Sequence, residues 1–143
     1  MEWNLDDSRP IWPQIKERLM AEIAAGRYPM GESFPTVREL AEDAKVNRNT
    51  MQRALSELEN EGLVITNRTA GRTVTTDREL IESIRERIAR EKLDGLIGEM
   101  RTLGFSVEDI IRMISTPGAD GSQEFASTDP AAEKHKNEKG ALR

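Results

Sequence analysis

Several residue types that carry chemistry in other proteins are missing or scarce in this chain of 143 residues. It contains no cysteine, which excludes disulfides, thiolate metal ligands and a cysteine nucleophile. Its single histidine, His135, lies in a polar stretch and is a poor candidate for a zinc ligand or for the base of a Ser-His-Asp triad. We therefore predict no catalytic site, no metal and no cofactor.

Long apolar runs are also missing. No stretch approaches the roughly 18 consecutive apolar residues that a membrane-spanning helix needs. The first seven residues lack the basic region and the apolar segment of a signal peptide. We expect a cytoplasmic protein that does not enter the membrane.

The charge balance is acidic, but the charges are unevenly distributed. A formal net charge of −5 argues at first against nucleic acid, because affinity for DNA comes largely from phosphate neutralisation. Residues 45–76, however, hold five basic and three acidic residues, and residues 62–76 hold two arginines and no acid. Distribution matters more than the sum, so this window is the candidate nucleic-acid interface.

Across the start of this window, from residue 36 onwards, the pattern is typical of two short helices joined by a tight turn. Apolar residues at every fourth position first predict a helix over residues 10–25. After a loop, Thr36 and Glu39 form a capping box that begins a second helix, which ends near Ala44. Asn47 is then a good N-cap for a third helix over residues 48–61.

The third predicted helix has one apolar face and one polar face. Its apolar residues, Met51, Ala54, Leu55 and Leu58, should pack on the preceding helices. The groups left free are guanidinium and amide groups, which bind guanine and adenine edges in the major groove. These side chains are Arg48, Asn49, Gln52 and Arg53.

A β-hairpin is predicted to follow this helix. Residues 63–66 and 72–75 are rich in β-branched side chains. In the loop between them, Gly71 is free to adopt a positive φ. We expect the hairpin to expose Arg68 and Arg72 near its tip.

Beyond residue 77 the pattern becomes helical again. An apolar stripe changes phase near residues 91–93, which predicts a bend or a change of packing partner. Gly104 should end this helix, and Ser106 should cap a last helix over residues 107–115, with Ile110, Ile111 and Ile114 facing inward. Two such helices cannot form an independent core, so we expect them to pack against a second copy rather than back on their own chain. The residues predicted for this contact are Leu93, Leu96, Ile97, Met100, Leu103, Phe105, Ile110, Ile111 and Ile114.

Four motifs carry a resemblance to a known family. Residues 10–15 (PIWPQI), 34–41 (FPTVRELA), 46–50 (VNRNT) and 58–64 (LENEGLV) look like parts of the DNA-binding domain of GntR-family transcriptional regulators. The resemblance covers residues 9–76 and implies a winged helix-turn-helix domain that binds operator DNA as a dimer. The segment after it is similar to the short helical tail of the YtrA subfamily, which implies a dimerisation appendage.

The resemblance also assigns roles to residues. It implies that Arg38 and Arg48 contact DNA, that Asn49, Thr50 and Gln52 line the recognition helix, and that the wing tip approaches the minor groove. The family often has arginine at position 52, so glutamine there predicts a shift in base preference from guanine towards adenine. The complete predicted set is Thr36, Arg38, Arg48, Asn49, Thr50, Gln52, Arg53, Arg68, Gly71 and Arg72.

The sequence therefore predicts a mainly α protein with a small β-hairpin wing. We expect a winged helix-turn-helix DNA-binding domain at residues 9–76, a helical dimerisation region at 77–115 and a disordered tail at 116–143, where few apolar residues are available for burial. The expected function is that of a homodimeric repressor that occupies double-stranded operator DNA. The alternative is a winged-helix module that binds protein and not DNA, which the acidic net charge favours. An enzyme is disfavoured, and no motif identifies a small-molecule effector.

Overall fold

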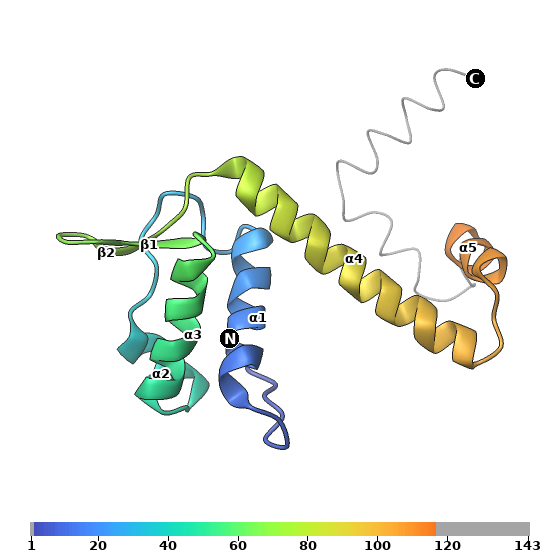
Figure 1. Ribbon diagram of the computed structural model, residues 1–143, viewed down its shortest axis with the longest axis horizontal. Helices are drawn as coiled ribbons and strands as arrows, with labels where there is room; N and C mark the ends of the chain where they lie inside the picture. The colour runs from blue at the N-terminus through green and yellow to red at the C-terminus, as the bar shows by residue number, and fades with distance from the viewer. Residues whose placement is uncertain (1, 117–143) are drawn as a thin grey trace. The chain divides into compact units, whose positions relative to one another are not determined.

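The computed structural model describes residues 2–116, so the predicted disordered tail, apart from Thr116, lies outside the described residues. Within this part the chain forms five helices and one β-hairpin (Figure 1). Their order is α1 (Ile11–Ala24), α2 (Val37–Ala44), α3 (Arg48–Asn60), β1 (Val64–Asn67), β2 (Gly71–Val74), α4 (Arg78–Thr102) and α5 (Val107–Ser115). The predicted mainly α class with a small hairpin is confirmed.

The chain divides into two compact units, and the division falls inside α4 between Lys92 and Leu93. We call residues 2–92 the winged unit and residues 93–116 the C-terminal unit. The division coincides with the predicted phase shift of the apolar stripe, yet α4 continues through it without a break. The shift therefore marks a change in what the helix packs against. No helix among residues 2–116 is both long enough and apolar enough to span a lipid bilayer.

The core of the winged unit lies between α1, α2 and α3, with α1 and α3 side by side (Figure 1). Ile81 and Ile84 at the start of α4 are also buried against this core. The side chains that are fully buried come from α1, α3 and the base of the hairpin, where its first and last residues meet. They include Ile15, Leu19, Ile23, Met51, Leu55, Leu58, Leu63 and Val64.

The predicted capping residues fix the positions of α2 and α3. Thr36 Oγ1 accepts a hydrogen bond from the Glu39 amide at 3.1 Å, and the Glu39 carboxylate accepts one from the Thr36 amide, which completes the capping box. Asn47 Oδ1 accepts from the Asn49 amide at 2.7 Å. These local hydrogen bonds satisfy helix donors that would otherwise lack partners, and they confirm the predicted helix-turn-helix.

Lys45 makes the turn between α2 and α3 in a conformation that L-residues rarely adopt. Its φ and ψ are 57° and 45°, the left-handed helical region. The Val46 amide donates to the Ala41 carbonyl at 3.0 Å across this turn. Glycine usually occupies such a helix C-terminus, and a side chain there costs about 1 kcal/mol.

The hairpin pairs Val64 with Val74 and Asn67 with Gly71, in antiparallel register. Gly71 has a φ of +73°, as predicted. The loop before α2, for which the sequence predicted no structure, also pairs with β2. The Phe34 amide donates to the Arg72 carbonyl at 2.8 Å, and Ser33 forms a bridge with Thr73. Backbone hydrogen bonds along the outer edge of β2 thus anchor the wing to the loop that leads into α2.

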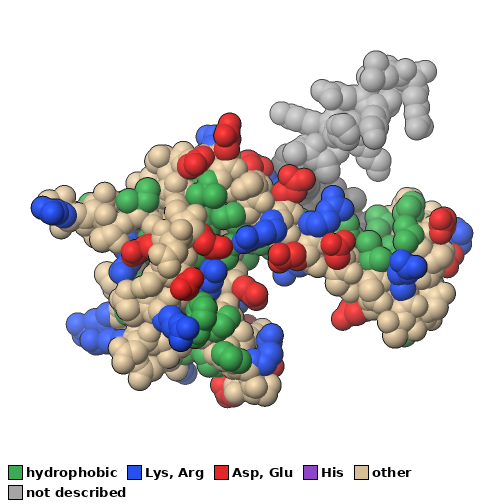
Figure 2. All heavy atoms as spheres, viewed as in Figure 1, with side chains coloured by type: hydrophobic (Ala, Val, Ile, Leu, Met, Phe, Trp, Pro, Cys, Tyr) green, Lys and Arg blue, Asp and Glu red, His purple; other side chains and the backbone are tan. Residues whose placement is uncertain are grey.

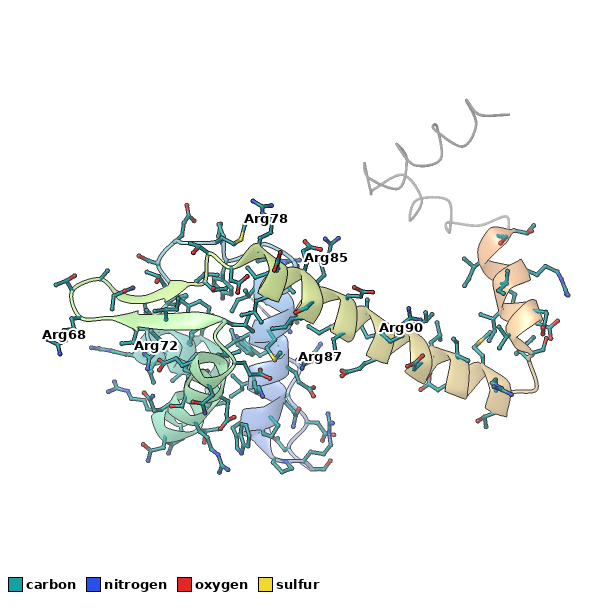
Figure 3. All side chains as sticks on the ribbon, turned by 45° about the horizontal axis from the view of Figure 1, so that its top comes forward. Arg68, Arg72, Arg78, Arg85, Arg87 and Arg90 are labelled. Atoms are coloured by element: carbon teal, nitrogen blue, oxygen red, sulfur yellow. The ribbon has the colours of Figure 1, made fainter. Side chains whose placement is uncertain are left out.

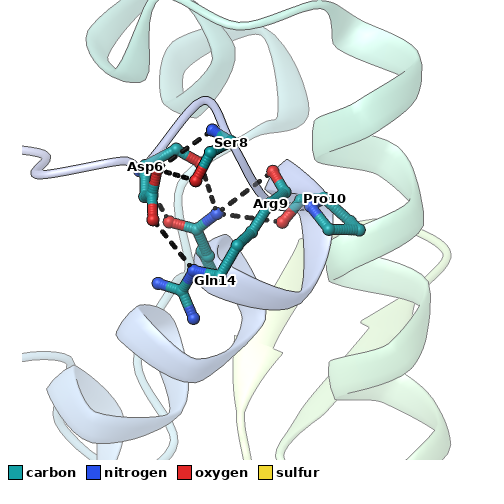
Figure 4. A network of polar contacts seen from close by, with 5 residues as sticks. All are labelled: Asp6, Ser8, Arg9, Pro10 and Gln14. Atoms are coloured by element: carbon teal, nitrogen blue, oxygen red, sulfur yellow. Dashed lines mark hydrogen bonds and ion pairs between the residues drawn. The ribbon is translucent and has the colours of Figure 1, made fainter.

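Residues 2–9, for which the sequence predicted no structure, pack on α1 and α2 within the winged unit. The Trp3 indole donates to Asp43 Oδ2 on α2 at 2.8 Å. Gln14 exchanges hydrogen bonds with the backbone of Asp6, and the Asp6 carboxylate accepts from Ser8 and Arg9 (Figure 4). The hydrogen bonds from Ser8, followed by that from Arg9, lower the pKa of Asp6. This network fastens the start of the chain to α1.

The C-terminal unit begins with the last turns of α4. Gly104 ends this helix and Ser106 forms a capping box with Asp109, as predicted. Ile110 is buried, but Ile111 and Ile114 are 57% and 65% exposed, so the prediction that all three face inward is wrong for the single chain. A nine-residue helix beside one helix end can cover only one line of its own side chains.

Candidate nucleic-acid interface

The polar face of α3 is open to solvent. Met51 and Leu55 on the opposite face are 0% exposed, whereas Arg48, Asn49 and Gln52 are exposed. The predicted division of this helix into a core face and a free face is confirmed. The arrangement presents guanidinium and amide groups together, as a helix in the major groove must.

Two arginines differ in how freely they can reach a phosphate or a base. Among residues 2–116, Arg48 makes no ion pair with an acidic side chain. Arg38 on α2 pairs with Glu42 at 3.2 Å, but the two side chains are 72% and 66% exposed. An exposed pair of this kind contributes little, so a phosphate could displace Glu42 at small cost.

Positive charge is distributed over the same side of the winged unit. Lysine and arginine side chains lie over α2 and the start of α3 and at the tip of the hairpin (Figure 2). Thr36 and Asn47 cap the N-termini of α2 and α3, where the positive end of each helix dipole also favours anions. Thr50 is half-buried in the first turn of α3, where it lies with Asn47 along a shallow depression. Local charge therefore suits a polyanion, although the whole chain is acidic.

The two wing arginines lie in different places (Figure 3). Arg68 is exposed at the hairpin tip, as predicted. Arg72 instead turns towards α3, where its Nε lies 2.5 Å from Glu59 Oε1 and its side chain is only 20% exposed. The prediction that Arg72 is exposed near the tip is therefore wrong. Gly71, beside it, has open space around it and leaves the tip unobstructed.

Glu59 holds the wing to α3 by two contacts. Besides the pair with Arg72, Glu59 Oε1 accepts a hydrogen bond from Thr66 Oγ1 at 2.8 Å. Burial raises the pKa of Glu59, but the hydrogen bonds from Arg72 and Thr66 and the charge of Arg72 outweigh it, so the pKa lies below its ordinary value. We call this arrangement of Glu59, Thr66 and Arg72 the wing clasp. Sequence reasoning missed it, because nothing local indicates a pair between residues 13 positions apart.

Arg53 also has a partner that the sequence did not indicate. Its guanidinium carbon lies 4.4 Å from the centre of the Trp12 ring on α1, and the side chain is exposed. Arg53 thus lies at the edge of the polar face that is nearest α1. The structure brings Arg48, Asn49, Gln52 and Arg53 together on α3 and keeps Arg68 on the wing.

A cleft of about 490 Å³ lies between α1 and the first half of α4. Its apolar lining includes Trp12, Met20 and Ile88. Two cations of the lining pair with Glu61: Lys16 Nζ lies 3.3 Å from Oε2, and Arg87 Nη1 lies 4.0 Å from Oε1. Because Glu61 engages these cations, the lining does not select an ion of either sign. The cleft therefore assigns no chemistry to a small-molecule effector, which no sequence motif identifies either.

The C-terminal unit exposes more large hydrophobic side chains than the winged unit. Among residues 2–116, eight of the ten exposed large hydrophobic side chains come from residues 93–114. They are Leu93, Leu96, Leu103, Phe105, Val107, Ile111, Met113 and Ile114. The predicted contact residues Ile97 and Met100 are half-buried. Exposed large apolar side chains that cluster in one short segment are typical of an interaction site.

Comparison with known proteins relates this chain to a family of regulatory proteins. Residues 13–74 match the family model described as bacterial regulatory proteins, gntR family. The HTH-type transcriptional regulator YhcF of Bacillus subtilis is 33% identical over 116 residues, which cover 81% of this chain and 96% of YhcF. The HTH-type transcriptional repressor YtrA of the same organism is 31% identical over 115 residues, which cover 79% and 88% of the two chains.

Solved structures agree with these sequence matches. A GntR family transcriptional regulator from Listeria monocytogenes superposes with a TM-score of 0.71 and 39% identity, over 78% of this chain and 97% of that one. A transcriptional regulator from Oenococcus oeni superposes with a TM-score of 0.62 and 25% identity, over 78% and 92%. Both similarities extend beyond the segment that the family model matches.

Proposed function

The chain belongs to the GntR family of bacterial regulatory proteins and is a DNA-binding transcriptional regulator, and from this premise we propose that it is a homodimeric repressor acting by operator occupancy in the cytoplasm. The observation that carries the proposal is the open polar face of α3 beside a wing that ends in Arg68. Of the relatives, YtrA is itself named a transcriptional repressor. A protein bound over an operator blocks transcription sterically and needs no chemistry of its own.

In the proposed complex, α3 is the recognition helix and enters the major groove. Arg48 would bind a guanine edge or a phosphate, while Asn49 and Gln52 would read adenine edges. Arg38 and the capped helix N-termini would bind phosphates, and Arg68 would reach the adjacent minor groove. Arg72 supports this contact indirectly, because the wing clasp holds the strand that leads to the tip.

The dimer would form through the C-terminal unit. In a dimer with twofold symmetry, the exposed apolar side chains of this unit would pack against the same surface of a second copy. We expect Ile114→Glu to convert the dimer to a monomer in sedimentation velocity, because each interface would then bury two unpaired carboxylates. Ile65→Glu, which changes a 47% exposed side chain on the wing, is the matched control and should leave the dimer intact. A monomeric wild type, or a dimer that survives Ile114→Glu, would contradict the assignment.

The second candidate, a winged-helix module that binds protein, is favoured only by the net charge of −5. A salt titration of duplex binding by fluorescence anisotropy separates the two. Between 50 and 200 mM salt we expect affinity to fall by at least about tenfold, the change that two or more phosphate contacts produce. Binding that is absent, or that does not respond to salt, would support the protein-binding module.

A further inference from the structure

Trp12 lies on α1, outside the helix-turn-helix, yet it contacts a side chain of the proposed recognition helix. The Arg53 guanidinium carbon is 4.4 Å from the centre of the Trp12 ring. This distance is well within the range of about 6 Å at which a cation is attracted to the face of an aromatic ring. Trp12 is also half-buried and packs against the core, so its ring provides a fixed surface.

We propose that Trp12 is a positioning residue for DNA binding, which holds the Arg53 guanidinium in an orientation ready to contact the DNA backbone or a base edge beside α1. The inference rests on the proposed function, since it assumes that α3 binds DNA. It adds a residue of α1 to the determinants of that binding.

The contact with Trp12 orders the Arg53 side chain without using its hydrogen-bond donors. The five N–H donors of a guanidinium lie in its plane and point outward from its edge. An indole stacked on the face of the guanidinium leaves that edge free, and it does not neutralise the charge. A carboxylate partner instead occupies donors on that edge and neutralises the charge, as Glu59 does for Arg72. Arg53 therefore remains a full cation with open donors, while its side chain has already lost part of its conformational freedom.

The other predicted DNA-binding arginines show how unusual this arrangement is. Arg38 and Arg72 pair with Glu42 and Glu59, whereas Arg48 and Arg68 make no ion pair within residues 2–116. Only Arg53 among these five is held by a neutral aromatic ring in the described part of the chain. An arginine whose side chain is already ordered binds more tightly than one whose side chain moves freely, because less side-chain entropy is lost when the complex forms.

The test is a double-mutant cycle measured as binding to a duplex that the wild-type protein selects from a random pool. Trp12→Leu removes the ring, Trp12→Met keeps apolar bulk, and Trp12→Tyr keeps an aromatic face. Each is measured alone and together with Arg53→Ala, at one salt concentration. Trp3→Leu is the matched control, because Trp3 also lies under an arginine, Arg18 at 5.5 Å, but on the N-terminal segment. Far-UV circular dichroism at the binding temperature establishes that each variant is folded.

We expect Trp12→Leu and Trp12→Met to weaken binding by about two- to fivefold, because the cost of ordering one long side chain then falls on complex formation. Trp12→Tyr should retain most of the affinity and Trp3→Leu all of it. In the Arg53→Ala background, the Trp12 substitutions should have no further effect. This last result separates positioning from a general loss of stability, which would weaken binding in either background.

Two results would overturn the proposal while leaving the proposed function intact. The first is wild-type affinity or tighter binding in both Trp12→Leu and Trp12→Met, which would mean that stacking is irrelevant to DNA binding or competes with it. The second is an equal loss in the presence and absence of Arg53. If the wild-type protein selects no duplex, the proposed function fails, and the role of Trp12 fails with it.

Discussion

Replacing Glu59 with alanine would remove both contacts of the wing clasp. The substitution deletes the acceptor for Thr66 Oγ1 at 2.8 Å and for Arg72 Nε at 2.5 Å, and it leaves a largely buried arginine without a carboxylate. Hydrogen bonds to charged groups contribute about 1.5–3 kcal/mol each when fully buried. Because the Glu59 and Arg72 side chains remain 31% and 20% exposed, we expect a total loss of about 1–2 kcal/mol.

The assay is urea unfolding at pH 7 and fixed protein concentration, since a dimer's stability depends on concentration. Glu57→Ala is the matched control, because Glu57 lies on the same helix and makes no ion pair among the described residues. Binding by Glu59→Ala should also weaken, as the wing loses its orientation. Equal stability of Glu59→Ala and Glu57→Ala would show that the wing clasp does not stabilise the fold.

The wing clasp also predicts a pH dependence of stability. The pKa of Glu59 lies below its ordinary value of 4.5, so the folded state favours the ionised carboxylate. Its contribution is fully present above about pH 4.5 and is lost as the pH falls through the lowered pKa. The stability difference between wild type and Glu59→Gln should therefore shrink as the pH is lowered below about 4.5. A difference that stays constant from pH 7 to pH 3 would contradict this assignment.

Two further predictions follow from single residues. Lys45→Gly should raise the free energy of unfolding by about 0.5–1 kcal/mol, because glycine adopts a φ of 57° without strain, and unchanged or lower stability in urea would disprove this. Arg48→Ala should weaken specific duplex binding by roughly 1–3 kcal/mol, the size of one bidentate base contact. Arg85→Ala on α4, where Arg85 pairs with Glu82, is its control, and equal affinities of the two variants would exclude a base contact by Arg48.

Helix ends were predictable from the sequence because their signals are local. The capping boxes at Thr36 and Ser106 each depend on two residues three positions apart, and both form as predicted. Gly104 ends α4 with a positive φ, as its place after the apolar stripe predicts. Lys45 shows the limit of this rule, because it takes a left-handed conformation that its side chain does not favour.

The candidate site was predicted less completely, because its geometry depends on contacts between distant residues. The polar face of α3 follows from helical periodicity, and Arg48, Asn49 and Gln52 are exposed as expected. Arg53 and Arg72 find partners on α1 and α3, which no local pattern indicates. Long arginine side chains reach whichever ring or carboxylate the fold brings near them.

In the C-terminal unit too, the sequence pattern predicted the helices but not their packing partner. An apolar stripe indicates that a helix face needs cover but not which surface provides it. Ile111 and Ile114 follow the stripe yet remain exposed in the single chain. The predicted boundaries of the three regions, at residues 76 and 115, stay predictions, whereas the compact units meet between Lys92 and Leu93.

In the proposed complex, the two recognition helices of a dimer read two half-sites in one duplex. Selection of duplexes from a random pool, followed by footprinting of the enriched sequence, tests this most directly. We predict an inverted repeat whose half-site centres are separated by roughly 10–10.5 base pairs or a multiple of that spacing. Protection of a single unrepeated half-site, or a failure to enrich any sequence, would contradict it.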